Sequence, residues 1–265
     1  THGREFSPVR YDYRRTVTEL FEEAFSRQYG QWCADHNLAL TGHYNAEQSL
    51  QFQTRCTGSV MVHYQHQQWP GIDILTDQCD ELLTAKQCSS VADQLGKPRV
   101  LSEMYGCTGW DWPLGRHKYV GDWQYACGVN FRCQHLTHYS LAGGAKRDYP
   151  ASIYAHSPWW PYYRAVEDYF GRLSYMLTRG RPVRDVLVIH PVQSAWGMYT
   201  NMRPNPSDAP ALHQINEQLK QLIFALSNGH YDWDFGDEDV LANHAAVTNG
   251  RLRVGQMDYR LVVIA

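Results

Sequence analysis

The stretch that decides the fold is VLSEMYGCTGWDW, residues 100–112. A short apolar run ends in the carboxylic acid of Glu103, and a loop of Gly, Tyr and Trp follows at once. An acid at the carboxyl end of a buried parallel strand is the usual position of a catalytic group in α/β barrels. Aromatic faces beside that acid are suited to holding a pyranose ring against it. The stretch therefore predicts a carbohydrate site at a strand end.

A structural role for Glu103 is the alternative. The side chain could cap the following turn or pair with a nearby arginine. We favour the functional interpretation, because acids at strand ends in aromatic clefts are where perturbed carboxylates gather.

Helices and strands alternate on either side of this stretch. Apolar runs predict strands at 38–43, 72–75, 99–103 and 129–134, and intervening segments predict helices at 13–36, 59–68, 80–95 and 118–127. In the first helix Val17, Leu20, Phe21, Ala24 and Phe25 form one apolar stripe. This alternation is typical of a parallel sheet covered on both faces.

Each predicted strand ends in a polar or ionisable residue: His43, Asp77, Glu103 and His135. Repetition of that arrangement is typical of a barrel whose strand ends carry the chemistry. Only four such units are present, whereas a closed barrel needs eight strands and about 250 residues. The fold class we predict is therefore α/β, with part of a barrel in residues 1–157.

The character of the chain changes in residues 158–265. A helix begins at Pro158 and ends near Gly180, followed by a strand at 186–191, a helix at 212–226, a possible edge strand at 231–235 and an apolar strand at 261–265. We interpret this part as a linker helix and the start of a second α/β domain, and we expect both ends of the chain to be cuts within domains.

The composition argues against two classes of function, nucleic-acid binding and membrane spanning. The net charge of −3 and the lack of long Lys/Arg runs argue against nucleic acid. No apolar stretch reaches the roughly 18–20 residues of a membrane span. The seven cysteines are scattered without a Cys-x-x-Cys pair, which favours reduced thiols and a cytoplasmic setting, while a secreted or periplasmic setting stays open. The sequence says nothing of the oligomeric state.

Several stretches together resemble a known family. They are Trp32-Cys33 through His43 with Glu47 after it, Ser102 to Gly106, Gly128 to His135, and Pro158 to Tyr163 running into Leu173-Ser174-Tyr175. In them the chain resembles bacterial α-L-rhamnosidases of glycoside hydrolase family 106, a (β/α)8-barrel family, and more loosely β-galactosidases of family 42. The resemblance implies a flavodoxin-like domain after the barrel.

The resemblance also implies a role for Glu103. In retaining barrel glycosidases the acid/base follows strand four and the nucleophile follows strand seven. If 129–134 is strand eight, Glu103 follows strand seven and is the nucleophile, or the general base if the enzyme inverts. Two carboxyls are needed, and the second would lie before Thr1, so we predict that this segment alone does not turn over substrate.

Seven other residues are predicted to bind the sugar: His43, Glu47, Tyr105, Trp110, Trp112, His135 and Tyr139. Glu47 could instead cap the next helix, and a lone histidine is more often structural. Of Trp110 and Trp112, we expect one to stack on sugar and one to pack beneath the loop.

We predict no cofactor and no metal site, with carbohydrate as the partner. His135 and His138 would face different ways in an extended segment, and His63 and His66 lack a third zinc ligand. A calcium ion stays open, because oxygen ligands leave little sequence signature.

Two other function classes stay open. One is a non-catalytic carbohydrate-binding protein on a degenerate barrel. The other is a nucleotide- or flavin-binding protein, for which Ser194-Ala195-Trp196-Gly197 is a poor match to the Gly-x-Gly-x-x-Gly spacing.

Overall fold

The computed structural model of the protein describes residues 6–144, 147, 153–200 and 209–264. Its helices are α1 (Pro8–Phe21), the π-helix η1 (Glu22–Arg27), α2 (Gln28–Asp35), α3 (Leu50–Cys56), α4 (Val60–Tyr64), α5 (Leu82–Leu95), α6 (Leu114–Ala126), the 3-10 helix η3 (Trp160–Tyr162), α7 (Arg164–Leu177), α8 (Val192–Met198), α9 (Pro210–Asn228) and α10 (Glu238–His244). None of these described helices has the length and apolarity needed to cross a membrane.

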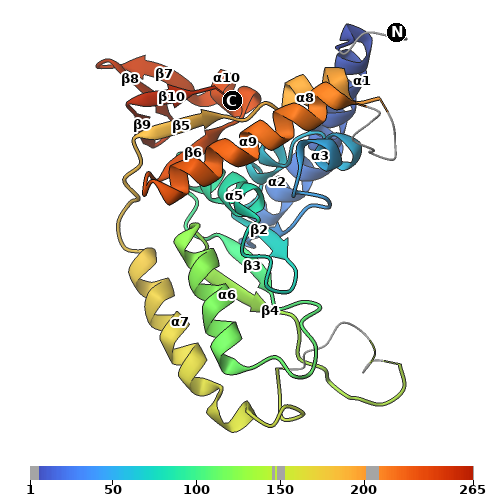
Figure 1. The fold of residues 1–265 in the computed structure, drawn as a ribbon, viewed down its shortest axis with the longest axis vertical. Coiled ribbons are helices and arrows are strands. Elements are labelled where there is room, and N and C mark those ends of the chain that lie inside the picture. The colour runs from blue at the N-terminus through green and yellow to red at the C-terminus, as the bar shows by residue number, and fades with distance from the viewer. Residues whose placement is uncertain (1–5, 145–146, 148–152, 201–208, 265) are drawn as a thin grey trace.

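The strands form three sheets (Figure 1). They are β1 (Thr41–Gly42), β2 (Trp69–Ile74), β3 (Leu101–Met104), β4 (Phe131–Gln134), β5 (Val186–Ile189), β6 (Trp233–Gly236), β7 (Ala245–Thr248), β8 (Arg251–Val254), β9 (Met257–Tyr259) and β10 (Leu261–Val263). Sheet orders are β1-β2-β3-β4, β10-β5-β6 and β7-β8-β9.

The first sheet is a parallel half-barrel. Every neighbouring pair in β1-β2-β3-β4 is parallel, and α5 and α6 make the crossovers from β2 to β3 and from β3 to β4. The four helix/strand units predicted from the sequence are therefore present, although β1 is only two residues long.

Helix α5 lies between the half-barrel and the second parallel sheet, where it contacts β2 and β6. Almost all of its side chains are buried, including the polar Gln87 and Gln94. It ends at Gly96, which adopts the left-handed conformation with φ of 66°, as glycine at a helix C-terminus commonly does. Because both sheets pack on α5, the core is continuous between them.

The segment predicted as a possible edge strand is β6, and it lies at the edge of the described order β10-β5-β6. Its residues are nevertheless buried, because α5 packs against it. The last strand, β10, pairs in parallel with β5. The antiparallel strands β7 to β9 and the short helix α8 were not expected, since their runs are too brief for a clear period.

The apolar stripe of the first helix is largely exposed rather than buried. Leu20 is 63% exposed and Phe25 is 46% exposed, while the small residues Thr18, Ser26 and Gly30 are buried instead. A Cβ at Gly30 would meet the backbone oxygen of His66 at 2.2 Å. The close contact between Gly30 and the His66 backbone therefore determines which face of the helix is buried. The spacing of hydrophobic residues alone predicts the wrong face.

A charged cluster joins the two halves of the chain. Arg184 binds Asp93 on α5 and reaches Asp232 at 2.8 Å and Asp234 at 3.0 Å. Asp234 is fully buried on β6 and also accepts a hydrogen bond from the Tyr259 hydroxyl. Lys86 also lies 3.0 Å from Asp232 and 3.8 Å from Asp234, so removal of Arg184 would leave three carboxylates facing a single ammonium, which is a buried charge imbalance.

We expect Arg184→Met to lower the free energy of unfolding by about 3–5 kcal/mol, as breaking a buried ion pair does. The matched control is Arg251→Met, whose partner Asp185 is half exposed, and whose loss should cost below about 1 kcal/mol. Urea unfolding of both variants measures the difference. Equal losses would show that the buried cluster adds nothing specific.

Candidate active site at the strand ends

The register of the half-barrel places functional side chains in one row. Asp73 on β2 pairs with Glu103 on β3, which pairs with Cys133 on β4. Because side chains alternate along a strand, all three project from the same face. His43 follows β1 directly and His135 follows β4. The carboxyl end of the sheet thus gathers two acids and two imidazoles.

Glu103 lies between the two histidines. Its Oε2 is 3.8 Å from His43 Nε2, and its Oε1 is 3.9 Å from His135 Nε2. His43 Nε2 is also 3.8 Å from Asp73 Oδ2. These separations exceed hydrogen-bond length, so the groups face one another without being bonded. The Glu103 side chain is 30% exposed, and no arginine covers it among the described residues.

Asp73 is the site residue that sequence reasoning missed. Burial raises the pKa of its carboxyl, the negative charge of Glu103 raises it further, and His43 and His135 oppose both effects. The predicted strand-end residue Asp77 instead forms an exposed ion pair with Arg116. The signal for Asp73 was its place in Ile72-Asp73-Ile74, an acid inside an apolar run.

Three of these side chains could hold a cation. His43, Asp73 and Glu103 each offer a ligand atom, and these atoms lie within 4.8 Å of one another. One imidazole and two carboxylates are donors that divalent metals accept. These three residues do not form a recognisable metal-binding motif in the sequence, because they lie on or directly after three different strands.

A hollow of about 310 Å³ opens beside the strand ends. It is lined by His43 and the segment that follows it, and by Asp73 of β2. Its further lining includes Tyr44, Glu47, Phe52, Gln78 and Glu81. A volume near 300 Å³ is at the lower end of about 300–1,000 Å³ typical of ligand clefts, so a small ring fits beside Asp73.

Glu47 is held under this hollow. Its side chain is buried, and it accepts hydrogen bonds from the Tyr64 hydroxyl and from the Tyr44 backbone N–H at 3.0 Å. Burial raises its pKa to about 8. Of the two roles left open for Glu47, this environment favours support of the strand-end segment, since both bonds are made within the protein.

The aromatic residues predicted to bind sugar divide into two groups. Tyr105 is fully buried, with its hydroxyl donating to the His117 carbonyl and accepting from Arg132, and Trp112 is nearly buried. A ring with almost no exposed surface cannot stack on a sugar, so a stacking role does not fit the position of Tyr105. Trp112 has the buried position expected for the one of the two tryptophans that packs beneath the loop. The loop after β3 turns their rings inward.

Trp110 and Tyr139 are accessible. Trp110 is 39% exposed and stacks on His138 with ring centroids 5.8 Å apart. Tyr139 is fully exposed and extends into solvent. The two predicted histidines, His43 and His135, are the residues brought next to Glu103.

Four parallel strands with acids and imidazoles at their carboxyl ends define an α/β fold with a parallel half-barrel. The family described as glycoside hydrolase family 106, alpha-L-rhamnosidase, matches residues 4–265. The chain belongs to this family.

Two relatives are similar to parts of the chain. The chain is similar in fold to part of a rhamnosidase from Novosphingobium sp. PP1Y, with a TM-score of 0.70 and 19% identity over 96% of this chain and 23% of that one. A putative beta-glucuronidase of Formosa agariphila is 27% identical over 184 residues, which are 67% of this chain and 15% of that relative. The chain thus spans less than a quarter of each relative.

The buried acid Glu47 should impose a pH dependence on stability. Its folded pKa of about 8 lies above the ordinary glutamate value, so the folded state holds the proton more tightly. Its contribution is therefore fully present at low pH and is lost as the pH rises towards 8. The slope for one such group is at most about 1.4 kcal/mol per pH unit.

Urea unfolding at pH 5, 6.5 and 8 checks this dependence. The difference in stability between the unchanged protein and Glu47→Gln should shift in favour of the variant as the pH rises. Glu23→Gln, which removes an exposed carboxylate beside Arg27, should follow the unchanged protein. Parallel profiles for Glu47→Gln and the unchanged protein would contradict the assignment.

Proposed function

We propose that this chain supplies the nucleophile or general base of an α-L-rhamnosidase-like glycoside hydrolase. Residues 1–157 would be the C-terminal half of a (β/α)8 barrel, with β4 as strand eight. Residues 158–265 would be a linker helix and the start of a flavodoxin-like domain. Family membership supports the reaction class, and the parallel half-barrel supports the strand numbering.

The observation that carries the proposal is the position of Glu103. It is the next-to-last residue of the parallel strand β3, keeps part of its surface open, and has Asp73 and two imidazoles around it. A carboxylate in that position can attack the anomeric carbon, or take a proton from the water that does so. In either case the glycosidic bond breaks and its oxygen takes a proton from a second carboxyl.

The neighbours of Glu103 have complementary roles in this proposal. His43 and His135 present ring nitrogens at the height of the acid, where they would bond sugar hydroxyls. Asp73 would add negative charge opposite the cationic transition state, since carboxylates stabilise an oxocarbenium-like carbon. Trp110 would hold one face of the sugar or of its neighbour.

Glu103→Gln in the complete polypeptide that carries this chain should lower kcat for an aryl α-L-rhamnoside by about 10³-fold or more, as loss of an essential catalytic group does. Glutamine keeps the size of the side chain but cannot attack or accept a proton. Stopped assays of released phenolate, with the unfolding midpoint as a check of folding, measure the effect.

Asp111→Asn is the control for that experiment. It removes a carboxylate from the exposed part of the loop that follows β3, so kcat should stay within about twofold. Normal turnover by Glu103→Gln would defeat the proposed function.

The second carboxyl should come from outside this chain. Under the strand numbering above, the acid that protonates the leaving group follows strand four. We therefore expect residues 1–265 expressed alone to release no sugar, while the complete polypeptide does. Turnover by residues 1–265 at the full rate would require both carboxyls to lie here, and Asp73 would then be the candidate for the second.

A further inference from the structure

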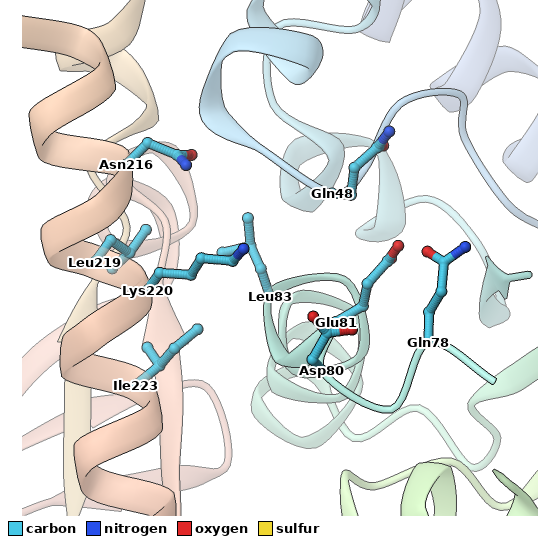
Figure 2. Close-up of a pocket in the computed structure, with 9 residues that line it drawn as sticks. All are labelled: Gln48, Gln78, Asp80, Glu81, Leu83, Asn216, Leu219, Lys220 and Ile223. Carbon is cyan, nitrogen blue, oxygen red and sulfur yellow. The ribbon is translucent and has the colours of Figure 1, made fainter. Parts of the chain in front are cut away.

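A second hollow adjoins the strand-end cleft. It has a volume of about 170 Å³ and lies between α9 and the segment that leads into α5 (Figure 2). Asn216, Leu219, Lys220 and Ile223 line it from α9, and Gln48, Gln78, Asp80, Glu81 and Leu83 line it from the half-barrel. Helix α9 belongs to the C-terminal part of the chain, so the two halves share this wall.

The two hollows are continuous at one border. Gln48, Gln78 and Glu81 line both the second hollow and the one beside His43 and Asp73. The charges of Asp73 and Glu81 also act on each other. A molecule bound at the strand ends can therefore extend past Glu81 towards α9.

Some polar groups of the second hollow are engaged within the protein: Asn216 Oδ1 accepts from the Leu50 backbone N–H, and Glu81 accepts from the Thr84 hydroxyl. Among the residues that the structure describes, no hydrogen bond occupies the side-chain amides of Gln48 and Gln78. The Lys220 ammonium has no carboxylate of a described residue within 4 Å, although its charge acts on Glu81. Figure 2 shows Lys220 reaching from α9 towards the helix that carries Leu83. Free amides and charged groups are suited to sugar hydroxyls, which both donate and accept hydrogen bonds.

The charges of the residues that line the second hollow favour a neutral sugar over an acidic one. Asp80 and Glu81 carry two carboxylates against the single ammonium of Lys220. An acidic sugar would meet net repulsion here, because like charges at short range are unfavourable in a partly buried site. A neutral sugar can donate hydroxyl protons to the carboxylates and accept from Lys220.

We propose that this second hollow is a subsite for a neutral sugar next to the residue held at the strand ends. The enzyme would thus favour an oligosaccharide or a branched glycan over a simple aryl glycoside. This inference rests on the proposed function, because it assumes that the sugar to be cleaved lies beside Glu103.

The test compares two substrates on the complete polypeptide. Asp80→Ala and Lys220→Ala are chosen because both residues are exposed and line only the second hollow. For a neutral oligosaccharide with a terminal α-L-rhamnose, kcat/KM should fall on the order of tenfold in each variant, the loss of about one charged hydrogen bond. For 4-nitrophenyl α-L-rhamnoside the fall should be below twofold.

Gln218→Ala is the matched control. Gln218 is an exposed residue of α9 outside the hollow, and its loss should alter neither substrate. Equal changes for both substrates in Asp80→Ala and Lys220→Ala, or no change for the oligosaccharide, would overturn the subsite.

Two further outcomes separate the alternatives. A preference of the unchanged protein for a glycan with a uronate in the second position, lost in Lys220→Ala, would overturn the neutral-sugar assignment. Failure of the unchanged protein to cleave either substrate would overturn the proposed function itself, whereas an unaltered substrate ratio in the variants overturns only the subsite.

Discussion

The parallel pairing of β2 with β3 is the constraint on which the rest of the site depends. It sets Asp73 beside Glu103, and two carboxylates at neighbouring strand positions repel each other unless positive or protonated groups lie close. His43 and His135 follow the two flanking strands, and their ring nitrogens lie within 4 Å of Asp73 and Glu103, respectively. A shift of β2 by one residue would turn Asp73 to the opposite face of the sheet.

Helix α5 explains why two sheets behave as one body. It is buried along nearly its whole length, and it carries both contacts to β2 and contacts to β6. Its polar residues find partners in the other half of the chain: Ser90 reaches Asp234, and Gln94 donates to the Phe235 carbonyl. A helix with so many buried polar groups specifies one packing arrangement, since each group needs its own partner.

Much of this architecture follows from local patterns. The strand that ends at Glu103, the helix that closes at Gly96 and the histidines after β1 and β4 could all be predicted, because each depends on a short apolar run and its boundary. Asp73 was missed because its role depends on register between strands, which one sequence does not display. The burial of Tyr105 was not predicted for a similar reason: its hydroxyl accepts a hydrogen bond from Arg132, which lies 27 positions away in the sequence. The outward face of the first helix escaped prediction because Gly30 and Thr18 allow close backbone contacts that outweigh hydrophobic spacing.

Helix α9 lies outside the sheet that holds the acids, yet its middle turns line the hollow that borders the one beside Asp73. Replacing a surface position on a regular helix seldom disturbs folding, whereas altering a strand end disturbs both fold and chemistry. If the proposed function and subsite hold, the choice of glycan would be separated from the breaking of its bond. Preference for new saccharides could then diverge through substitutions on α9 that leave the proposed reacting centre unchanged.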